Sequence, residues 1–269
     1  MKVEGLQIIN GGQTSKTVQA TLSAFTTPPA NLEQTFVLVR LYQIPQEAAP
    51  WVQTVTYATN SQSPVDLRDL HANDERQKRL ELSMRELGYE YRRQRSESAF
   101  KPTEIGTATA AEALISVWRR RPQQARFQTI EHFGKHYDSI FPENLSAAQL
   151  VIAVLLFRIA ENKRKKPPVN SPDFMPYASH FAAMLMGQYL LADLGLSLAK
   201  LDHRVFERSR KMVEERGEAC FNRAIDDLAA AVRAVHPTPV SLRRLSATFR
   251  RSDLFDYLPK PDPSTGLPD

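Results

Sequence analysis

The feature that most constrains this fold is a long series of helix-spaced apolar residues in the second half of the chain. Residues with this spacing are Ala110, Leu114, Val117 and Trp118, followed by the segments 147–160, 178–191 and 205–235. Such a period places apolar side chains on one face of an α-helix. Residues 101–257 are therefore predicted to form an all-helical region. Residues 258–269 contain four prolines and are predicted to form a disordered tail.

The first hundred residues have a different pattern, which predicts a small α/β core. Short apolar runs at residues 6–9 and 36–42 are typical of buried strands. The residues between them have helical spacing, with Thr14 as the expected cap. Two strands joined by a helix of this length indicate a crossover unit.

Three further elements complete the predicted core. Residues 47–58 are helical in pattern, and a second helix is expected from a cap at Asn73 or Asp74 to Gly88. Residues 89–93 alternate like a third short strand or an extended arm. The predicted fold class is therefore α+β and helix-rich, with an α/β core at residues 1–100 followed by the helical region.

Composition limits the class of protein. Of the 269 residues 42% are apolar, which is enough to bury a core. The longest apolar stretch, residues 150–159, contains Arg158 and is far shorter than the roughly 20 residues of a membrane-spanning helix. No signal peptide is visible, and the single cysteine, Cys220, excludes an internal disulfide framework. We expect a reduced, cytoplasmic protein that does not bind a membrane.

The net charge of +5 arises because arginine and lysine cluster while the acids are spread. The clusters lie at residues 92–95, 119–121, 163–166, 243–244 and 250–251. Each cluster taken alone fits a solvated surface or a helix C-terminus. The excess nevertheless permits nucleic-acid binding, and Arg92, Arg93 and Arg95 are predicted to form a basic face for it.

The sequence I-I-N-G-G-Q-T-S-K-T at residues 8–17 is the first candidate site. It resembles a P-loop in placing a lysine at a helix start, but the glycines that a P-loop requires fall on Asn10 and Ser15. Free N–H groups at a helix start favour an anion, whereas the alternative is a simple tight turn. The predicted phosphate- or nucleotide-binding residues are Asn10, Gly11, Gly12, Gln13, Thr14, Lys16 and Thr17.

A second polar group of residues follows at positions 59–77. Amide side chains bind bases and sugars through paired hydrogen bonds, and an arginine can reach a phosphate. The alternative is a series of helix caps, since Ser, Asn and Asp all favour helix starts. The residues predicted to line a pocket with the first motif are Asn60, Gln62, Arg68, Asn73, Asp74 and Gln77.

No motif meets a known catalytic spacing. His132 and His136 are four residues apart, but Phe133 replaces the carboxylate of a zinc protease motif, and no metal site is predicted. There is no nucleophile elbow. A nuclease or nucleotide hydrolase would instead use the carboxylates of Asp66, Asp69 and Asp74 with Mg²⁺. No other cofactor is expected.

Several short segments occur in an order that is specific in combination. They are I-I-N-G-G-Q-T, T-N-S-Q, D-L-R-D-L-H-A-N-D-E-R-Q, G-Y-E-Y-R-R-Q-R and, further on, F-G-K-H-Y-D-S-I-F. Together they resemble the AIPR family, the abortive-infection phage-resistance proteins of bacteria, over roughly residues 5–145. The resemblance implies a defence role. Family members usually carry a long region ahead of N-G-x-Q-T, so it also implies a short form or fragment corresponding to the C-terminal AIPR domain.

A more distant likeness is to the ParB and sulfiredoxin-like core. There a D/N-G-x-x-R motif at a helix start, with a later asparagine–proline element, serves nucleotide and DNA binding. Asn10-Gly11 matches the beginning of that motif, but Thr14 stands in place of the arginine. The likeness therefore implies that the charge gripping a phosphate comes from elsewhere, from Lys16 or Arg68.

Three hypotheses for the function follow from these observations. The leading one is a nucleic-acid- or nucleotide-binding module of a phage-defence system, with both polar motifs lining one pocket. The second is the metal-dependent nuclease or nucleotide hydrolase. The third is a scaffold whose helical half binds a protein partner in a defence complex.

Overall fold

The computed structural model describes residues 12–23, 36, 67–94 and 101–268. The chain divides into two compact units, residues 1–66 and 67–269, and each is described by itself. This division falls earlier than the boundary at residue 100 that the sequence predicts. The reason is that residues 67–94 pack with the helices that follow them.

The described part of the first unit contains the helix α1 (Gly12–Ser23), which the sequence predicts. It begins before Thr14, the expected cap, and its side chains from Ser15 onward are exposed. The predicted strand at 6–9 and helix at 47–58 lie outside the described residues, as does the strand at 36–42 apart from Phe36. The crossover unit and its likeness to ParB stay predictions.

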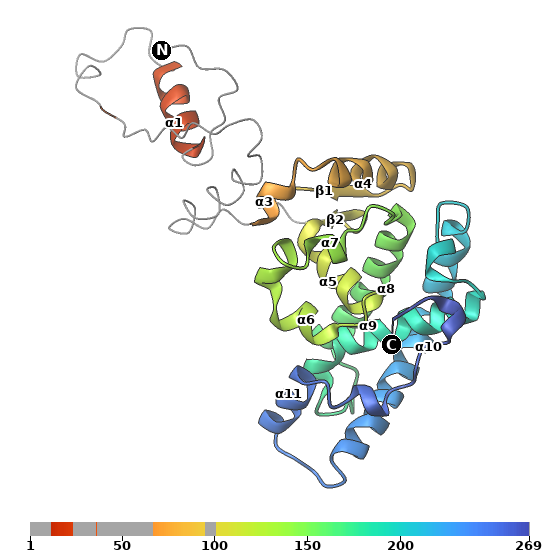
Figure 1. Cartoon of the computed structure of the whole chain (residues 1–269). Coiled ribbons are helices and arrows are strands. Elements are labelled where there is room, and N and C mark those ends of the chain that lie inside the picture. The colour runs from red at the N-terminus through yellow and green to blue at the C-terminus, as the bar shows by residue number, and fades with distance from the viewer. Residues whose placement is uncertain (1–11, 24–35, 37–66, 95–100, 269) are drawn as a thin grey trace. The chain divides into compact units, whose positions relative to one another are not determined.

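The second unit is built on four helices that the sequence predicts. They are α5 (Thr107–Val117), α8 (Ala147–Lys165), α9 (Met175–Leu194) and α10 (Phe206–Val235). The other three pack against α9, which is buried along nearly its whole length (Figure 1). This arrangement confirms a helix-rich α+β fold. No helix in the described ranges is long and apolar enough to cross a bilayer.

Two local features fix how these helices start and approach one another. Ser146 begins α8 with a capping box, in which its hydroxyl and the Gln149 side chain each accept a backbone N–H of the other residue. Gly187 lets α9 approach the end of α5 closely. A Cβ atom there would lie 2.4 Å from Val117 Cγ1 and 3.0 Å from Trp118 Cζ3.

A short parallel sheet joins the beginning of the second unit to its helices. Strand β1 (Glu90–Arg92) pairs with β2 (Glu104–Gly106), and Tyr91 stands opposite Ile105. Both side chains are buried. Strand β1 confirms the predicted third strand, whereas β2 was not predicted.

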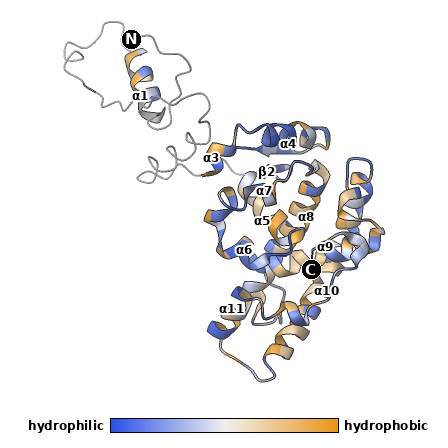
Figure 2. Ribbon diagram, in the orientation of Figure 1, coloured by the Kyte–Doolittle hydropathy of each residue, from blue (hydrophilic) through white to orange (hydrophobic). Residues whose placement is uncertain are grey.

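The remaining elements surround this frame. They are α3 (Leu67–His71), α4 (Glu75–Glu86), α6 (Pro122–Phe127), α7 (Tyr137–Ile140) and α11 (Leu242–Arg250), with the short 3₁₀ helices η3 (Thr129–Phe133), η4 (Leu198–Lys200), η5 (Phe255–Tyr257) and η6 (Pro263–Thr265). Helix α4 confirms the helix expected before Gly88, which has a φ of 81°. Figure 2 shows the contrast between the hydrophilic α4 and the apolar α8.

Residues 258–268 pack against the helical body, where the sequence predicted a disordered tail. Leu258, Thr265 and Leu267 are buried. Gln188 on α9 also donates a hydrogen bond from Nε2 to the carbonyl of Lys260 at 2.8 Å. The prolines of this segment prevent a long helix, but they do not prevent its leucines from reaching the core.

Candidate functional site

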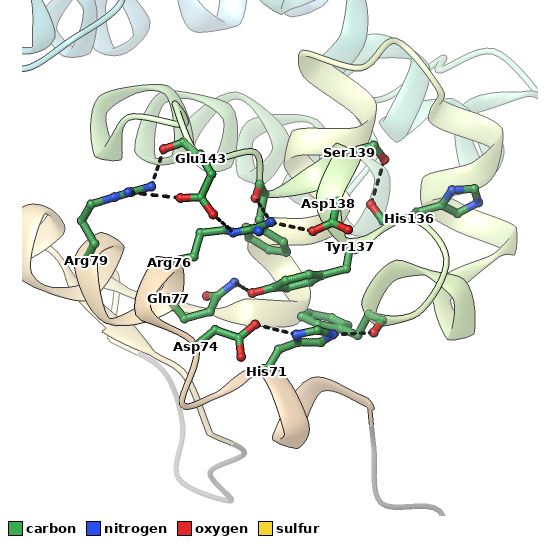
Figure 3. Close-up of polar contacts among 12 residues, drawn as sticks. His71, Asp74, Arg76, Gln77, Arg79, His136, Tyr137, Asp138, Ser139 and Glu143 are labelled. Atoms are coloured by element: carbon green, nitrogen blue, oxygen red, sulfur yellow. Dashed lines mark hydrogen bonds and ion pairs between the residues drawn. The ribbon is translucent and has the colours of Figure 1, made fainter. Parts of the chain in front are cut away.

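The candidate site lies where the chain from α3 to α4 meets the chain from η3 to α7 (Figure 3). The first segment carries D-L-R-D-L-H-A-N-D-E-R-Q and the second carries F-G-K-H-Y-D-S-I-F. Gln77 and Tyr137 are 60 residues apart in sequence, yet their side chains are hydrogen-bonded. The two motifs therefore build one surface, which we call the motif surface, formed by residues 67–79 and 133–143.

His71 connects the two segments through both ring nitrogens. Its Nδ1 lies 2.7 Å from Asp74 Oδ2, and its Nε2 lies 3.0 Å from the carbonyl oxygen of Phe133. Both partners offer oxygen atoms, so the two ring nitrogens are both engaged. Asp74 stands at the N-cap position of α4 but makes no side-chain capping bond, because its carboxylate faces His71 instead. Neither ring nitrogen is left free to act as a base.

Tyr137 forms the centre of the motif surface. Its ring stacks on His71 with centroids 3.5 Å apart and an interplanar angle of 13°. Its hydroxyl accepts a hydrogen bond from Gln77 Nε2 at 3.1 Å, and Gln77 Oε1 accepts one from the Tyr91 hydroxyl at 2.7 Å. Burial raises the pKa of the Tyr137 hydroxyl well above its usual value. The phenol therefore stays protonated at neutral pH.

Arg76 and Arg79 form the outer edge of the motif surface. Arg76 donates to Asp138 at 2.8 Å and to the carbonyl of Phe141 at 2.7 Å, and its Nε lies 2.9 Å from Glu143. Arg79 also pairs with Glu143, at 3.4 Å. The side chains of Asp138 and Glu143 are 87% and 72% exposed, whereas that of Arg76 is only 20% exposed. A guanidinium fixed by backbone and aromatic contacts thus faces solvent-exposed carboxylates.

The predicted phosphate-binding motif lies partly within the described residues. Gly12, Gln13, Thr14, Lys16 and Thr17 belong to α1, where Lys16 and Thr17 are exposed. Asn10, Gly11, Asn60 and Gln62 lie outside the described residues. The pocket that joins them to the second motif therefore stays a prediction.

Four predicted pocket residues belong to the second unit, and they have different environments. Arg68 is half-buried, with its guanidinium carbon 5.7 Å from the centroid of the Phe133 ring, and Asn73 is exposed. Asp74 bonds His71. Gln77 is only 1% exposed, so it bridges two tyrosines inside the unit instead of lining a solvent-facing pocket as predicted. It is buried because Tyr91 and Tyr137 enclose it.

The predicted basic face is largely paired with acids. Arg92 Nη2 lies 2.7 Å from the buried carboxylate of Glu104, and Arg93 Nε lies 2.8 Å from Glu81. Arg93 also donates to the carbonyl of Ala72. Arg95 lies outside the described residues. These pairs hold β1 against its neighbours, and a role in nucleic-acid binding stays a prediction.

Several functional candidates were not among the predicted pocket residues. They are His71, Arg76, Arg79, Tyr137, Asp138 and Glu143. For Tyr137, Asp138 and Glu143 the signal that could have found them is the second motif, where His136, Tyr137, Asp138 and Ser139 follow one another. Polar residues between two phenylalanines indicate a segment whose ends are buried in the core and whose middle reaches the surface.

Metal binding finds no support in the described ranges, where no three His, Cys, Asp or Glu side chains could hold an ion together. Of the three carboxylates considered for catalysis, Asp74 is bound to His71. Asp66 and the side chain of Asp69 lie outside what the structure describes. The metal-dependent enzyme thus stays a prediction.

A family model described as AIPR protein matches residues 1–239. No curated protein and no solved structure matches the chain significantly. The matched range contains all of the motif surface.

Proposed function

Because this chain belongs to the AIPR family, whose role is abortive-infection defence against phage, we propose that it acts there by binding nucleic acid or a nucleotide. The polar motif at residues 10–17 and the motif surface would both contribute phosphate contacts. The family supports the defence role, and the arrangement of side chains supports the ligand class.

The observation that carries this proposal is the way Arg76 and Arg79 are held at the surface and paired with exposed carboxylates. Both guanidiniums are held at the protein surface, and the carboxylates that pair with them are exposed. Exposed ion pairs contribute only about 0–1 kcal/mol, so a competing anion can displace them at little cost. A phosphate group offers the same paired oxygens as a carboxylate, and the terminal phosphate of a nucleotide also carries more negative charge. Two prepositioned arginines are therefore suited to exchange carboxylates for ligand phosphates.

The same geometry favours binding over hydrolysis. A general base needs a free acceptor near its substrate. His71 uses both ring nitrogens, Asp74 bonds the His71 ring, and Asp138 and Glu143 are each paired with an arginine. His71 is therefore not suited to activate water.

The test measures binding by the full chain to labelled single-stranded DNA, double-stranded DNA, RNA and ATP at several salt concentrations. Arg79→Ala is expected to weaken binding about tenfold and to reduce the salt slope by about one. Arg208→Ala, which removes an exposed arginine on α10, is the matched control and should bind as the parent chain does. A chain that binds none of these ligands at low salt contradicts the proposal. Turnover with Mg²⁺ that is lost in Asp74→Ala would favour the enzyme instead.

A further inference from the structure

Three arginines from distant parts of the chain come together on the helical unit, away from the motif surface. Arg126 and Arg250 both stack on Phe127, with guanidinium carbons 5.6 and 4.8 Å from the ring centroid. Arg126 also lies 5.9 Å from the ring of Tyr177 on α9. Arg164, on α8, and its ion-pair partner Glu161 both lie near enough to Arg126 for their charges to act on it, with opposite signs. We call Arg126, Arg164 and Arg250 the arginine cluster.

The arginine cluster holds more positive charge than its neighbours neutralise. Glu161 bonds Arg164 through two hydrogen bonds, of 2.9 and 2.8 Å. In the described part of the chain, no carboxylate lies within ion-pair distance of Arg126 or Arg250. Burial lowers the pKa of Arg126 most, the charges of Arg164 and Arg250 lower it further, and those of Glu161 and Tyr177 act in the opposite direction. Like charges are therefore held close together against their repulsion.

Arg126 also carries an unsatisfied donor. Its Nη1 atom is buried and has no hydrogen-bond partner. A buried charged donor without an acceptor is unfavourable and rare in native proteins. An anion that reached this guanidinium would supply the acceptor and reduce the repulsion at the same time.

The favourable effect of a positive charge at a helix C-terminus explains why each arginine lies in a last turn. It does not explain why the three arginines lie close together. Arg126, Arg164 and Arg250 each lie in the last turn of a helix, where positive charge is favourable. That effect acts on each helix separately and would be equally satisfied if the three ends pointed apart. Instead two of the three helices, α6 and α11, pack against each other, and their arginines share the Phe127 ring.

We propose that Arg126, Arg164 and Arg250 form a binding site for a phosphate group of a nucleotide or a nucleic-acid strand. Guanidinium groups bind phosphate through paired N–H donors, and contact with aromatic rings holds two of them in place before the ligand arrives. Only the class of ligand is taken from the proposed function. The arginine cluster itself is independent of that function, because it shares no residue with the motif surface.

The experiment titrates the full chain with inorganic pyrophosphate, with ATP and with a short labelled DNA strand. Arg250 is exposed, so Arg250→Ala removes one guanidinium without opening the core. It is expected to weaken binding roughly tenfold, and Arg126→Ala at least as much. Arg208→Ala on α10 is the matched control and should leave binding unchanged. Binding of pyrophosphate and ATP would identify a free nucleotide as the source, and binding of the strand alone would identify nucleic acid.

Comparison with Arg79→Ala separates this proposal from the previous one. If Arg250→Ala weakens binding and Arg79→Ala does not, the arginine cluster is the site and the motif surface is not. The reverse result overturns the arginine cluster and leaves the motif surface standing. Unchanged binding in Arg250→Ala overturns the arginine cluster even if Arg126→Ala fails to fold, which thermal unfolding of each variant would reveal. A chain that binds none of the three probes overturns both proposals.

Discussion

Gln77 donates a hydrogen bond from its Nε2 atom to the hydroxyl of Tyr137 at 3.1 Å, across 60 residues of sequence. The same amide accepts a hydrogen bond from Tyr91 at 2.7 Å. One side chain thus links three of the segments by which the family is recognised. The amide is buried, so it acts as an internal connection on which the motif surface depends.

The first prediction concerns this connection. Gln77→Leu keeps the volume of the side chain but leaves the buried Tyr91 hydroxyl without its partner and removes one of the two side-chain partners of the Tyr137 hydroxyl, which should lower the free energy of unfolding by about 1–3 kcal/mol. Urea denaturation measures the change. Lys78→Ala, at the partly exposed neighbouring position of α4, should change it by less than about 0.5 kcal/mol. Equal stability of Gln77→Leu and the parent chain would show that the bridge is not needed.

The second prediction compares two glycines inside helices. Gly187→Ala places a Cβ 2.4 Å from Val117 Cγ1, and a β-branched side chain cannot move aside easily. We expect the overpacking to destabilise the chain by about 1–3 kcal/mol. Gly217→Ala meets only the flexible end of Ile159, at 2.6 Å, so its higher helix propensity should make it neutral or stabilising.

Thermal unfolding of both variants checks this contrast. The double variant Gly187→Ala, Val117→Ala should recover part of the loss, because it removes the clashing methyl groups. Equal melting temperatures for Gly187→Ala and Gly217→Ala would contradict the close approach of α9 and α5.

The third prediction concerns acid stability. Burial alone would raise the pKa of Glu161, but hydrogen bonds from Arg164 and Ser179 outweigh it and lower the pKa from 4.5 to about 2. A carboxylate with a depressed folded-state pKa stabilises the chain above its unfolded pKa and loses that effect as the pH falls towards its folded pKa. Glu161→Gln should therefore flatten the decline of stability between about pH 4.5 and pH 2.

Urea denaturation at a series of pH values measures that decline. Glu207→Gln changes an exposed carboxylate on α10, so its stability should decline with falling pH as that of the parent chain does. If Glu161→Gln lost stability between about pH 4.5 and pH 2 as steeply as the parent chain does, Glu161 would not be the cause of that loss.

The fourth prediction uses Cys220, the single thiol of the sequence. Burial and the nearby charge of Asp193 raise the pKa of this thiol above its usual value. Reaction with a thiol reagent should be slow at neutral pH in the native chain, and the same chain in denaturant should react much faster. The rate would be followed by absorbance between pH 7 and 10. Equal rates in the two states would show that Cys220 is open to solvent.

The sequence predicts the helices well because their signal is local. Apolar spacing and caps identify α4, α5, α8, α9 and α10, and the alternation at residues 89–93 identifies β1. Strand β2 has only three residues, which is too short for a period, and its position depends on pairing with β1. Residues 258–268 carry prolines, and local propensity cannot show that their leucines reach the core.

The site was predicted less completely, for a related reason. The residue types of the second motif suggested polar recognition, but whether an amide lines a pocket or lies inside depends on its distant neighbours. Gln77 is buried because Tyr91 and Tyr137 enclose it, and neither contact can be read from local spacing. Arg126 and Arg250 meet for the same kind of reason, because Arg250 packs on the ring of Phe127, which follows Arg126 in α6 and is more than 100 residues away from Arg250 in sequence.

The meeting of residues 67–79 with residues 133–143 also sets an order of events during synthesis. The ribosome releases α3, α4 and β1 before the segment that encloses them exists, so their buried polar groups first face water. Contacts between residues far apart in sequence form late, because a long loop must close before they are gained. The recognition segments of this protein should therefore mature together as one late step, and a chain arrested before residue 133 would contain residues 67–79 without the segment that completes the motif surface.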